Sequence, residues 1–175
     1  FETNLDGWTF YGVGNITRET SQHYSGTTSA LVERLASQPR YAYANLPVTV
    51  GLPYTASAYV KQQTTANDFV TLSIEWMDSS GSSISENSEN WFTSTTAGWT
   101  RGSITATAPV GAVTARVGIN NAQTYYLDAV LFEQSDTLGS YIEGTVAGGS
   151  SAQWVQVKAI SALEASILTR MAAVE

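Results

Sequence analysis

The chain has 175 residues, of which 43% are hydrophobic and only 13% are charged, about half the charged share of an average soluble protein. Eight Lys and Arg against fifteen Asp and Glu give a net charge of −7, so the basic stripe that nucleic-acid binding requires is missing. The sequence contains no cysteine, which excludes disulfides, thiolate metal sites and cysteine nucleophiles.

No apolar stretch reaches the roughly 20 residues of a membrane-spanning helix, and no basic segment opens the chain. We therefore expect neither membrane insertion nor an export signal in these residues. The chain begins at Phe1 and not at a methionine, so we expect it to be a piece of a longer polypeptide.

Short runs with a two-residue period follow one another as far as residue 133, which is typical of half-buried strands. In the clearest run an apolar face alternates with Thr71, Ser73 and Glu75, and this face consists of Val70, Leu72, Ile74 and Trp76. The pattern predicts at least these seven strands: Ala30–Arg34, Arg40–Leu46, Tyr54–Lys61, Val70–Trp76, Trp99–Ala106, Thr114–Ile119 and Tyr125–Phe132. Many short strands without crossover helices indicate an all-β antiparallel sandwich, either immunoglobulin-like or a jelly roll.

The C-terminal part follows a different pattern. Residues 1–135 form the predicted sandwich, residues 136–152 a Gly/Ser-containing linker, and residues 153–175 an amphipathic helix. The helix has one apolar stripe, made of Ile160, Leu163, Ile167, Met171 and Val174. A single helix of this length needs a partner surface, so it either packs on the sandwich or pairs with copies of itself as an oligomerisation stalk. Arg170 interrupts the heptad pattern of the second alternative.

Residues for catalysis are sparse. The single histidine, His23, lies in a turn-like stretch and is expected on the surface, and no hydrolase, zinc or phosphate-loop motif occurs. Glu86 and Glu89 lie in a Ser/Asn-rich segment that we expect to be a loop with solvated charges. We therefore expect no enzyme activity.

Aromatic rings beside polar groups are a second possible functional signal, because sugar rings stack on Tyr and Trp. Tyr59 lies with Lys61 on the polar side of its predicted strand. If side chains of neighbouring strands share that face, they form a shallow polar platform for a ligand; the alternative is an ordinary solvated face. The candidate ligand contacts are Tyr43, Tyr59, Lys61, Glu75, Arg116 and Asn120.

An ordered series of motifs between Phe1 and Glu133 resembles the carbohydrate-binding-module-like jelly rolls. The series comprises Phe1-Glu2, Asp6-Gly7-Trp8, Tyr24-Ser25-Gly26, Ser29-Ala30-Leu31-Val32, the strand from Tyr54 to Lys61, Gly98-Trp99-Thr100-Arg101, Ala108-Pro109 and Tyr125 to Glu133. The resemblance implies a jelly roll. With so little charge, and with Leu138-Gly139-Ser140-Tyr141 after the last strand, the chain is similar to domains of minor tail and other virion surface proteins of actinobacterial phages.

This resemblance implies a non-enzymatic virion module for assembly and adhesion to host-surface glycans. Its implied partners are other virion proteins and copies of itself, with a trimer favoured. The alternative is an ancillary carbohydrate-binding module of a secreted bacterial glycoside hydrolase, which would be extracellular.

Jelly rolls of this kind often hold a structural calcium ion. The positions that match its ligands are Glu2 in the opening motif and Asp128 in the last strand. Calcium takes six to eight oxygens, so backbone carbonyls around Gly26 and Thr28 would complete the shell. The alternative is that both acids make hydrogen bonds at strand ends.

Overall fold

The computed structural model describes residues 1–2, 4–11, 14–34, 40–63, 68–93, 98–121 and 123–141. In this part of the chain all regular structure is β-strand, and it contains no helix long and apolar enough to cross a membrane. The predicted helix at 153–175, with its stripe Ile160, Leu163, Ile167, Met171 and Val174, lies outside the described residues, as does most of the predicted linker.

Ten strands follow one another along the chain. They are β1 (Trp8–Tyr11), β2 (Gly14–Glu19), β3 (Ser29–Arg34), β4 (Arg40–Pro47), β5 (Pro53–Gln62), β6 (Asp68–Met77), β7 (Ser83–Thr93), β8 (Thr100–Thr107), β9 (Thr114–Asn121) and β10 (Tyr125–Glu133). Each of the seven predicted strands is present, extended or shortened by a few residues.

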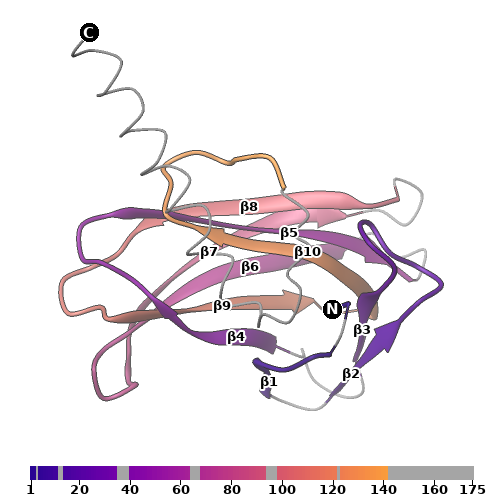
Figure 1. Cartoon of the computed structure of the whole chain (residues 1–175), viewed down its shortest axis with the longest axis horizontal. Helices are drawn as coiled ribbons and strands as arrows, with labels where there is room; N and C mark the ends of the chain where they lie inside the picture. Colours follow the sequence, from indigo (N-terminus) through magenta and orange to yellow (C-terminus); the bar gives the residue numbers. More distant parts are fainter. Residues whose placement is uncertain are drawn as a thin grey trace, which may run out of the picture.

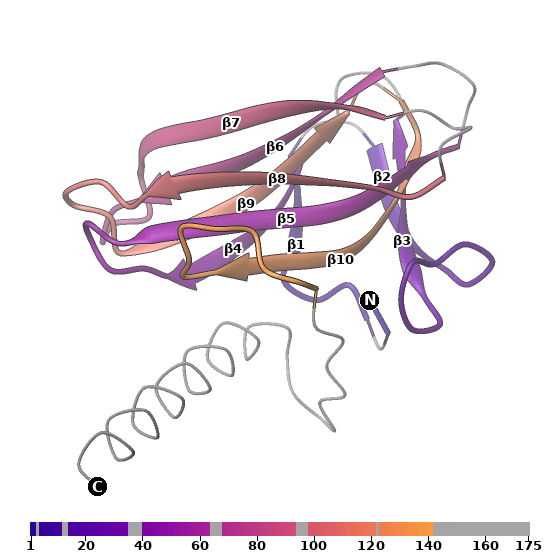
Figure 2. The ribbon, with the colours of Figure 1, turned by 90° about the horizontal axis from the view of Figure 1, so that it is seen from above.

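The strands form two five-stranded sheets that lie against each other as two layers (Figures 1 and 2). Sheet A has the order β1-β4-β9-β6-β7, and sheet B has the order β2-β3-β10-β5-β8. Every strand pair is antiparallel. The predicted all-β antiparallel class is therefore confirmed, whereas the jelly-roll assignment stays a prediction.

The core consists of the alternate apolar residues of both sheets. It includes Ala56, Ala58 and Val60 of β5, Val70, Leu72, Ile74 and Trp76 of β6, Val117 and Ile119 of β9, and Tyr125 and Leu127 of β10. The Trp76 ring is fully buried and lies edge-on to Tyr54 at 6.0 Å, and Tyr54 stacks on Phe132 at 5.3 Å. The predicted inward face of β6 is confirmed.

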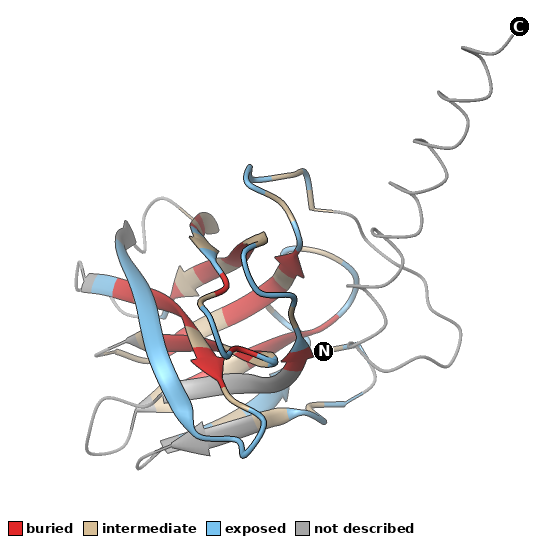
Figure 3. Ribbon diagram, turned by 90° about the vertical axis from the view of Figure 1, so that its left-hand side faces the viewer, coloured by how far each residue is buried: buried red, intermediate tan, exposed pale blue. Residues whose placement is uncertain are grey.

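The segment around Glu86 and Glu89 is not a loop but the strand β7, so this prediction was wrong. β7 pairs with β6 from Ser83 to Thr93 and forms one edge of sheet A. Its residues from Ser83 to Asn90 are all exposed, and this strand is the long pale-blue one in Figure 3. A strand segment that is exposed to solvent on both faces does not alternate between apolar and polar residues, which is why its sequence does not indicate a strand.

The hairpin between β6 and β7 turns at residues 78–82. Asp78 Oδ1 accepts hydrogen bonds from the amides of Ser80 (2.8 Å) and Ser82 (2.9 Å), and Gly81 has a φ of 79°. This is common turn chemistry, since the Asp carboxylate accepts hydrogen bonds from amides that follow it and Gly adopts positive φ freely.

Candidate functional site

Three rows of small or polar residues cross the outer face of sheet A, where β9, β6 and β7 lie side by side (Figure 1). Their register positions are Arg116–Glu75–Glu86, Gly118–Ser73–Ser88 and Asn120–Thr71–Asn90. Because Leu72 and Ile74 of β6 are buried in the core, the alternate residues of these rows face outward. We call these nine residues the polar strip.

The polar strip has charged groups at one side and amides at the other. Arg116 Nη1 donates to Glu75 Oε2 at 3.1 Å, and these two side chains are only 22% and 13% exposed. Two rows away, Thr71 Oγ1 donates to Asn90 Oδ1 at 2.6 Å. The Asn120 Oδ1 atom is buried and accepts no hydrogen bond from the described residues. Rows two residues apart are separated by about 7 Å, so the strip offers donors and acceptors on both sides of a line of small residues.

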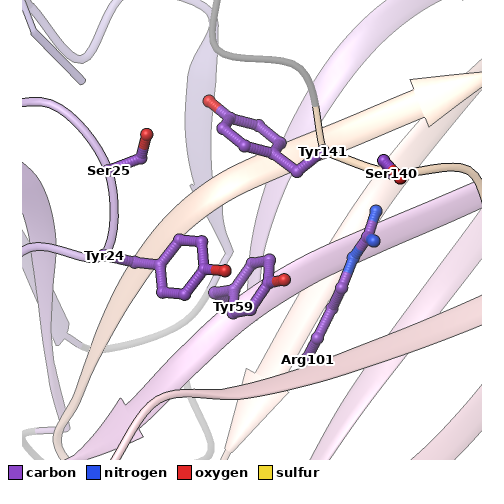
Figure 4. A pocket seen from close by; sticks show the side chains of 6 residues that line it. All are labelled: Tyr24, Ser25, Tyr59, Arg101, Ser140 and Tyr141. Atoms are coloured by element: carbon purple, nitrogen blue, oxygen red, sulfur yellow. The ribbon is translucent and has the colours of Figure 1, made fainter.

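A second polar area lies on the outer face of sheet B. The Tyr24 and Tyr59 rings stack with centroids 3.6 Å apart, the Arg101 guanidinium lies 5.5 Å from the Tyr59 ring centroid, and Trp99 is edge-on to Tyr24 at 6.2 Å. These groups border a pocket of about 410 Å³ whose lining residues appear in Figure 4: Tyr24, Ser25, Tyr59, Arg101, Ser140 and Tyr141. We call it the tyrosine pocket.

The segment of residues 135–141, which we call the strap, is fastened to sheet B beside this pocket. The Ser135 carbonyl accepts a hydrogen bond from Thr55 Oγ1 (2.9 Å), and the Gly139 carbonyl accepts one from Arg101 Nη1 (2.8 Å). Glu133 Oε1 also accepts from the Gly139 amide (3.1 Å). This anchorage explains why Thr55, on the outer face of sheet B, is only 1% exposed.

Glu2 and Asp128 hold the loop between β2 and β3. Glu2 accepts hydrogen bonds from the amides of Thr27 and Thr28 and from Thr27 Oγ1. Asp128 accepts from the amides of Tyr24, Ser25 and Ala129. Burial raises the pKa of Asp128, and this effect exceeds the opposite effect of the hydrogen bonds from the three amides. For Glu2, burial also raises the pKa, but the hydrogen bonds from Thr27 and Thr28 outweigh it, so the pKa of Glu2 is lowered.

The groups directed at these two carboxylates are hydrogen-bond donors, whereas calcium needs oxygen ligands. Thr28 Oγ1 is a buried oxygen without a hydrogen-bond partner in the described part of the chain, but no group of three or more His, Cys, Asp or Glu suited to a metal occurs there. The hydrogen-bonding alternative therefore accounts for both acids by itself. Calcium at Glu2 and Asp128 stays a prediction.

The structure divides the predicted platform between the two sheets. Glu75, Arg116 and Asn120 do lie together on neighbouring strands of sheet A, but Tyr59 and Lys61 belong to β5 of sheet B. The two groups therefore lie on opposite outer faces of the sandwich. The sequence could not reveal this, because side-chain alternation within a strand does not specify which sheet the strand joins. A single platform that includes Tyr59 was therefore a wrong prediction.

The other predicted contacts have different outcomes. Lys61 Nζ donates to Gln22 Oε1 at 2.7 Å on the outer face of sheet B. The backbone register sets Tyr43 opposite Val117 of β9, while its side chain lies outside the described part. His23 is exposed, as expected.

Sequence analysis missed Tyr24, Arg101 and Tyr141 as members of a site. Arg101 follows the alternation of β8, with Ser103 and Thr105 on the same side, so its outward direction was readable. Tyr24 and Tyr141 lie outside strands, and only the folded chain brings them to Tyr59. Trp99, just before β8, is partly exposed and lies edge-on to Tyr24.

Comparisons with known proteins support the fold. No protein-family model matches the chain, and no curated protein sequence matches it. Among solved structures, it is similar to the C-terminal family 22 carbohydrate-binding module of Clostridium thermocellum xylanase 10B, with a TM-score of 0.66 and 18% identity over 79% of this chain and 92% of that one.

Two further similar structures belong to larger proteins. One is the N-terminal part of the same xylanase 10B, with a family 22 module and a catalytic module, in complex with xylohexaose (TM-score 0.63, 24% identity). The other is the enzymatically active domain of tailspike protein 4 of bacteriophage CBA120 (TM-score 0.59, 14% identity). The matched region spans 75% of this chain and 26% of the xylanase chain in the first case, and 74% of this chain and 19% of the tailspike chain in the second. At such identities the likeness is one of fold, shared by carbohydrate-binding modules and a phage protein.

Proposed function

We propose that this chain is a non-enzymatic module of a phage virion, located on the particle surface or in a minor tail protein, that serves assembly and adheres to host-surface glycans. The observation that carries the glycan-binding part is the polar strip on sheet A. Glycans present many hydroxyl groups, which need donors and acceptors on an accessible surface. The strip supplies both, across three adjacent strands.

The fixed geometry of the strip favours this role. The Glu75–Arg116 pair is mostly buried, so each side chain holds the other in place before a ligand arrives, and less conformational entropy is lost on binding. Asn120 is half-buried, and although its Oδ1 is enclosed, its Nδ2 can donate to a ligand hydroxyl. A fold shared with carbohydrate-binding modules and a tailspike domain is consistent with adhesion.

A glycan array probed with the whole 175-residue chain tests the proposal. The array should include xylohexaose, the ligand in one similar structure, together with bacterial wall oligosaccharides. We expect binding to at least one glycan, and a two- to tenfold weaker affinity in Asn120→Ala, the range of one neutral hydrogen bond. The matched control is Thr107→Ala in β8, an exposed residue of the other sheet.

The outcomes separate the parts of the proposal. Absence of binding to every glycan contradicts the adhesive role. Binding that Asn120→Ala leaves unchanged contradicts the polar strip as its site.

The second candidate is an ancillary carbohydrate-binding module of a secreted bacterial glycoside hydrolase. It is favoured by the similarity to family 22 modules of xylanase 10B, one of which is joined to a catalytic module in its structure. Mass spectrometry discriminates between the two roles. Peptides of this chain in purified phage particles support the virion role, and peptides in culture medium, joined to a hydrolase domain, support the alternative.

A further inference from the structure

The tyrosine pocket lies on sheet B, the sheet opposite the polar strip, and the proposed function does not use it. Figure 4 shows the Tyr24 and Tyr59 rings and Arg101 in a line, with Tyr141 and Ser140 across from them. Every lining residue except Arg101 carries a hydroxyl group. With a volume of about 410 Å³ the pocket falls in the range of roughly 300–1,000 Å³ that is usual for small-molecule sites.

Arg101 brings a positive charge that no carboxylate of the described residues neutralises. Its guanidinium donates only to neutral oxygens, the Gly139 carbonyl and Ser57 Oγ at 2.8 and 2.9 Å. Lys61, two residues after Tyr59, also donates to a neutral oxygen, that of Gln22. A partly buried cation without a counter-charge favours binding of an anion, and the guanidinium suits a carboxylate in particular.

The acids on this face are directed elsewhere. Asp128 stands opposite Tyr59 in β10, but its oxygens accept the amides of Tyr24, Ser25 and Ala129. Glu133 accepts the Gly139 amide beneath the strap. The charged side chain that lines the pocket is therefore a cation, in a protein whose net charge is −7.

The pocket is also held in shape without a ligand. Arg101 is fixed at two of its nitrogens, and the backbone of Tyr24 and Ser25 is fixed by Asp128. The neighbouring Tyr59 hydroxyl raises the pKa of the Tyr24 hydroxyl, burial adds to this effect, and the charge of Arg101 opposes it. Tyr24 thus stays a neutral hydroxyl that can donate and accept.

We propose that the tyrosine pocket is a second binding site, for a single sugar unit that carries a carboxylate, such as a uronic acid. Arg101 binds the carboxylate, and the hydroxyls of Tyr24, Tyr59, Ser25, Ser140 and Tyr141 bind the ring hydroxyls. A neutral sugar lacks the group that Arg101 recognises. A simple carboxylate lacks the hydroxyls that the other residues recognise.

Titration of the isotope-labelled 175-residue chain, followed by nuclear magnetic resonance, tests this site. The probes are D-glucuronate, D-glucose and acetate. We expect glucuronate to shift the amide signals of Tyr24 and Ser25 and to bind at least about tenfold more tightly than either of the other two. Higher salt should weaken glucuronate binding, because the attraction to Arg101 is screened.

Two variants assign the effect to the pocket. Arg101→Gln should weaken glucuronate binding about tenfold or more, whereas Arg40→Gln removes the same charge from β4 of the other sheet and should leave it unchanged. Because Arg101 also anchors the strap, Tyr59→Phe serves as the second variant. It deletes one hydroxyl, keeps the ring stack, and should weaken binding two- to tenfold.

Equal affinity for glucose or acetate overturns the proposal, as does unchanged glucuronate binding in both pocket variants. Shifts confined to the polar strip around Ser73 and Gly118 overturn it too. Glycan binding lost in Asn120→Ala with glucuronate binding retained would show that the two sites are separate. A negative array with a positive glucuronate titration would contradict the proposed function alone.

Discussion

Ala129 has a φ of 49°, in the left-handed region that residues other than glycine rarely adopt. It lies in β10, where the pairing with β5 shifts between Asp128 and Leu131. Such a bulge changes the direction of a neighbouring side chain. At this bulge Asp128 Oδ1 accepts the Ala129 amide at 2.7 Å while Oδ2 accepts the amides of Tyr24 and Ser25. One strained residue thus accompanies the contact between the last strand and the loop at residues 24–28.

Calcium at Glu2 and Asp128 can be tested directly. If the ion binds only the folded chain, it stabilises that chain by RT ln(1 + [L]/Kd), and its removal from a well-occupied site lowers the melting temperature by several degrees. We expect a chelator to lower the melting temperature and calcium to restore it. Magnesium, which demands a tighter octahedral shell, should restore it less.

Asp128→Asn provides the control, since a response to calcium that survives in this variant would indicate a different site. An unchanged melting temperature in the wild type would leave Glu2 and Asp128 as hydrogen-bond acceptors alone.

At the level of elements, β7 shows how an edge strand forms without alternation of apolar and polar residues. Ten of its eleven residues pair with β6, so backbone hydrogen bonds to β6 hold it in place. Exposed Glu86 and Glu89 lie along it, and charges on an edge strand oppose pairing with other chains. The core residue Trp76 also donates a hydrogen bond from Nε1 to Asn87 Oδ1 at 2.8 Å.

The β6–β7 turn gives the prediction at this scale. Hydrogen bonds from Ser80, Ser82 and Gly81 hold the pKa of Asp78 below its usual 3.8, so its ionised form is favoured in the folded chain. The resulting stability is present above pH 3.8 and is lost as the pH falls through the lower folded pKa. We expect Asp78→Ala to lower the free energy of unfolding in urea at neutral pH, and the difference from wild type to shrink below pH 4.

Ser79→Ala, in the same exposed turn, should change little at either pH. A difference between Asp78→Ala and wild type that does not vary with pH would mean that the turn is stabilised by its backbone shape and not by the carboxylate.

At the level of the whole molecule, two outer faces of different chemistry lie on opposite sides of one core. Sheet A presents the polar strip with its ion pair, and sheet B presents tyrosines, Arg101 and the strap. Arg101 also joins the pocket to the strap, through its hydrogen bond to the Gly139 carbonyl. Several copies in one assembly would multiply weak binding by effective concentration.

Light scattering measures the assembly state of the whole chain. We expect a trimer that forms through the apolar stripe of Ile160, Leu163, Ile167, Met171 and Val174. Ile167→Asp should convert it to a monomer, because it would leave an unpaired charge in an apolar contact. Ser166→Asp places the same charge one residue away, off the stripe, and should keep the trimer. A wild-type monomer, or a trimer in Ile167→Asp, would contradict the stripe as the contact.

The sequence by itself determined seven of the strands and the inward side of β6, because residue alternation is a local property with a period of two. It also indicated that Tyr59, Lys61, Glu75 and Arg116 point away from the core. Only the tertiary structure decided that the first two belong to sheet B and the last two to sheet A, since sheet membership depends on pairing between strands far apart in the chain. The tyrosine pocket has the same origin: Tyr24, Arg101 and Tyr141 come from separate segments, and long-range pairing of β5 with β8 and β10 brings them together.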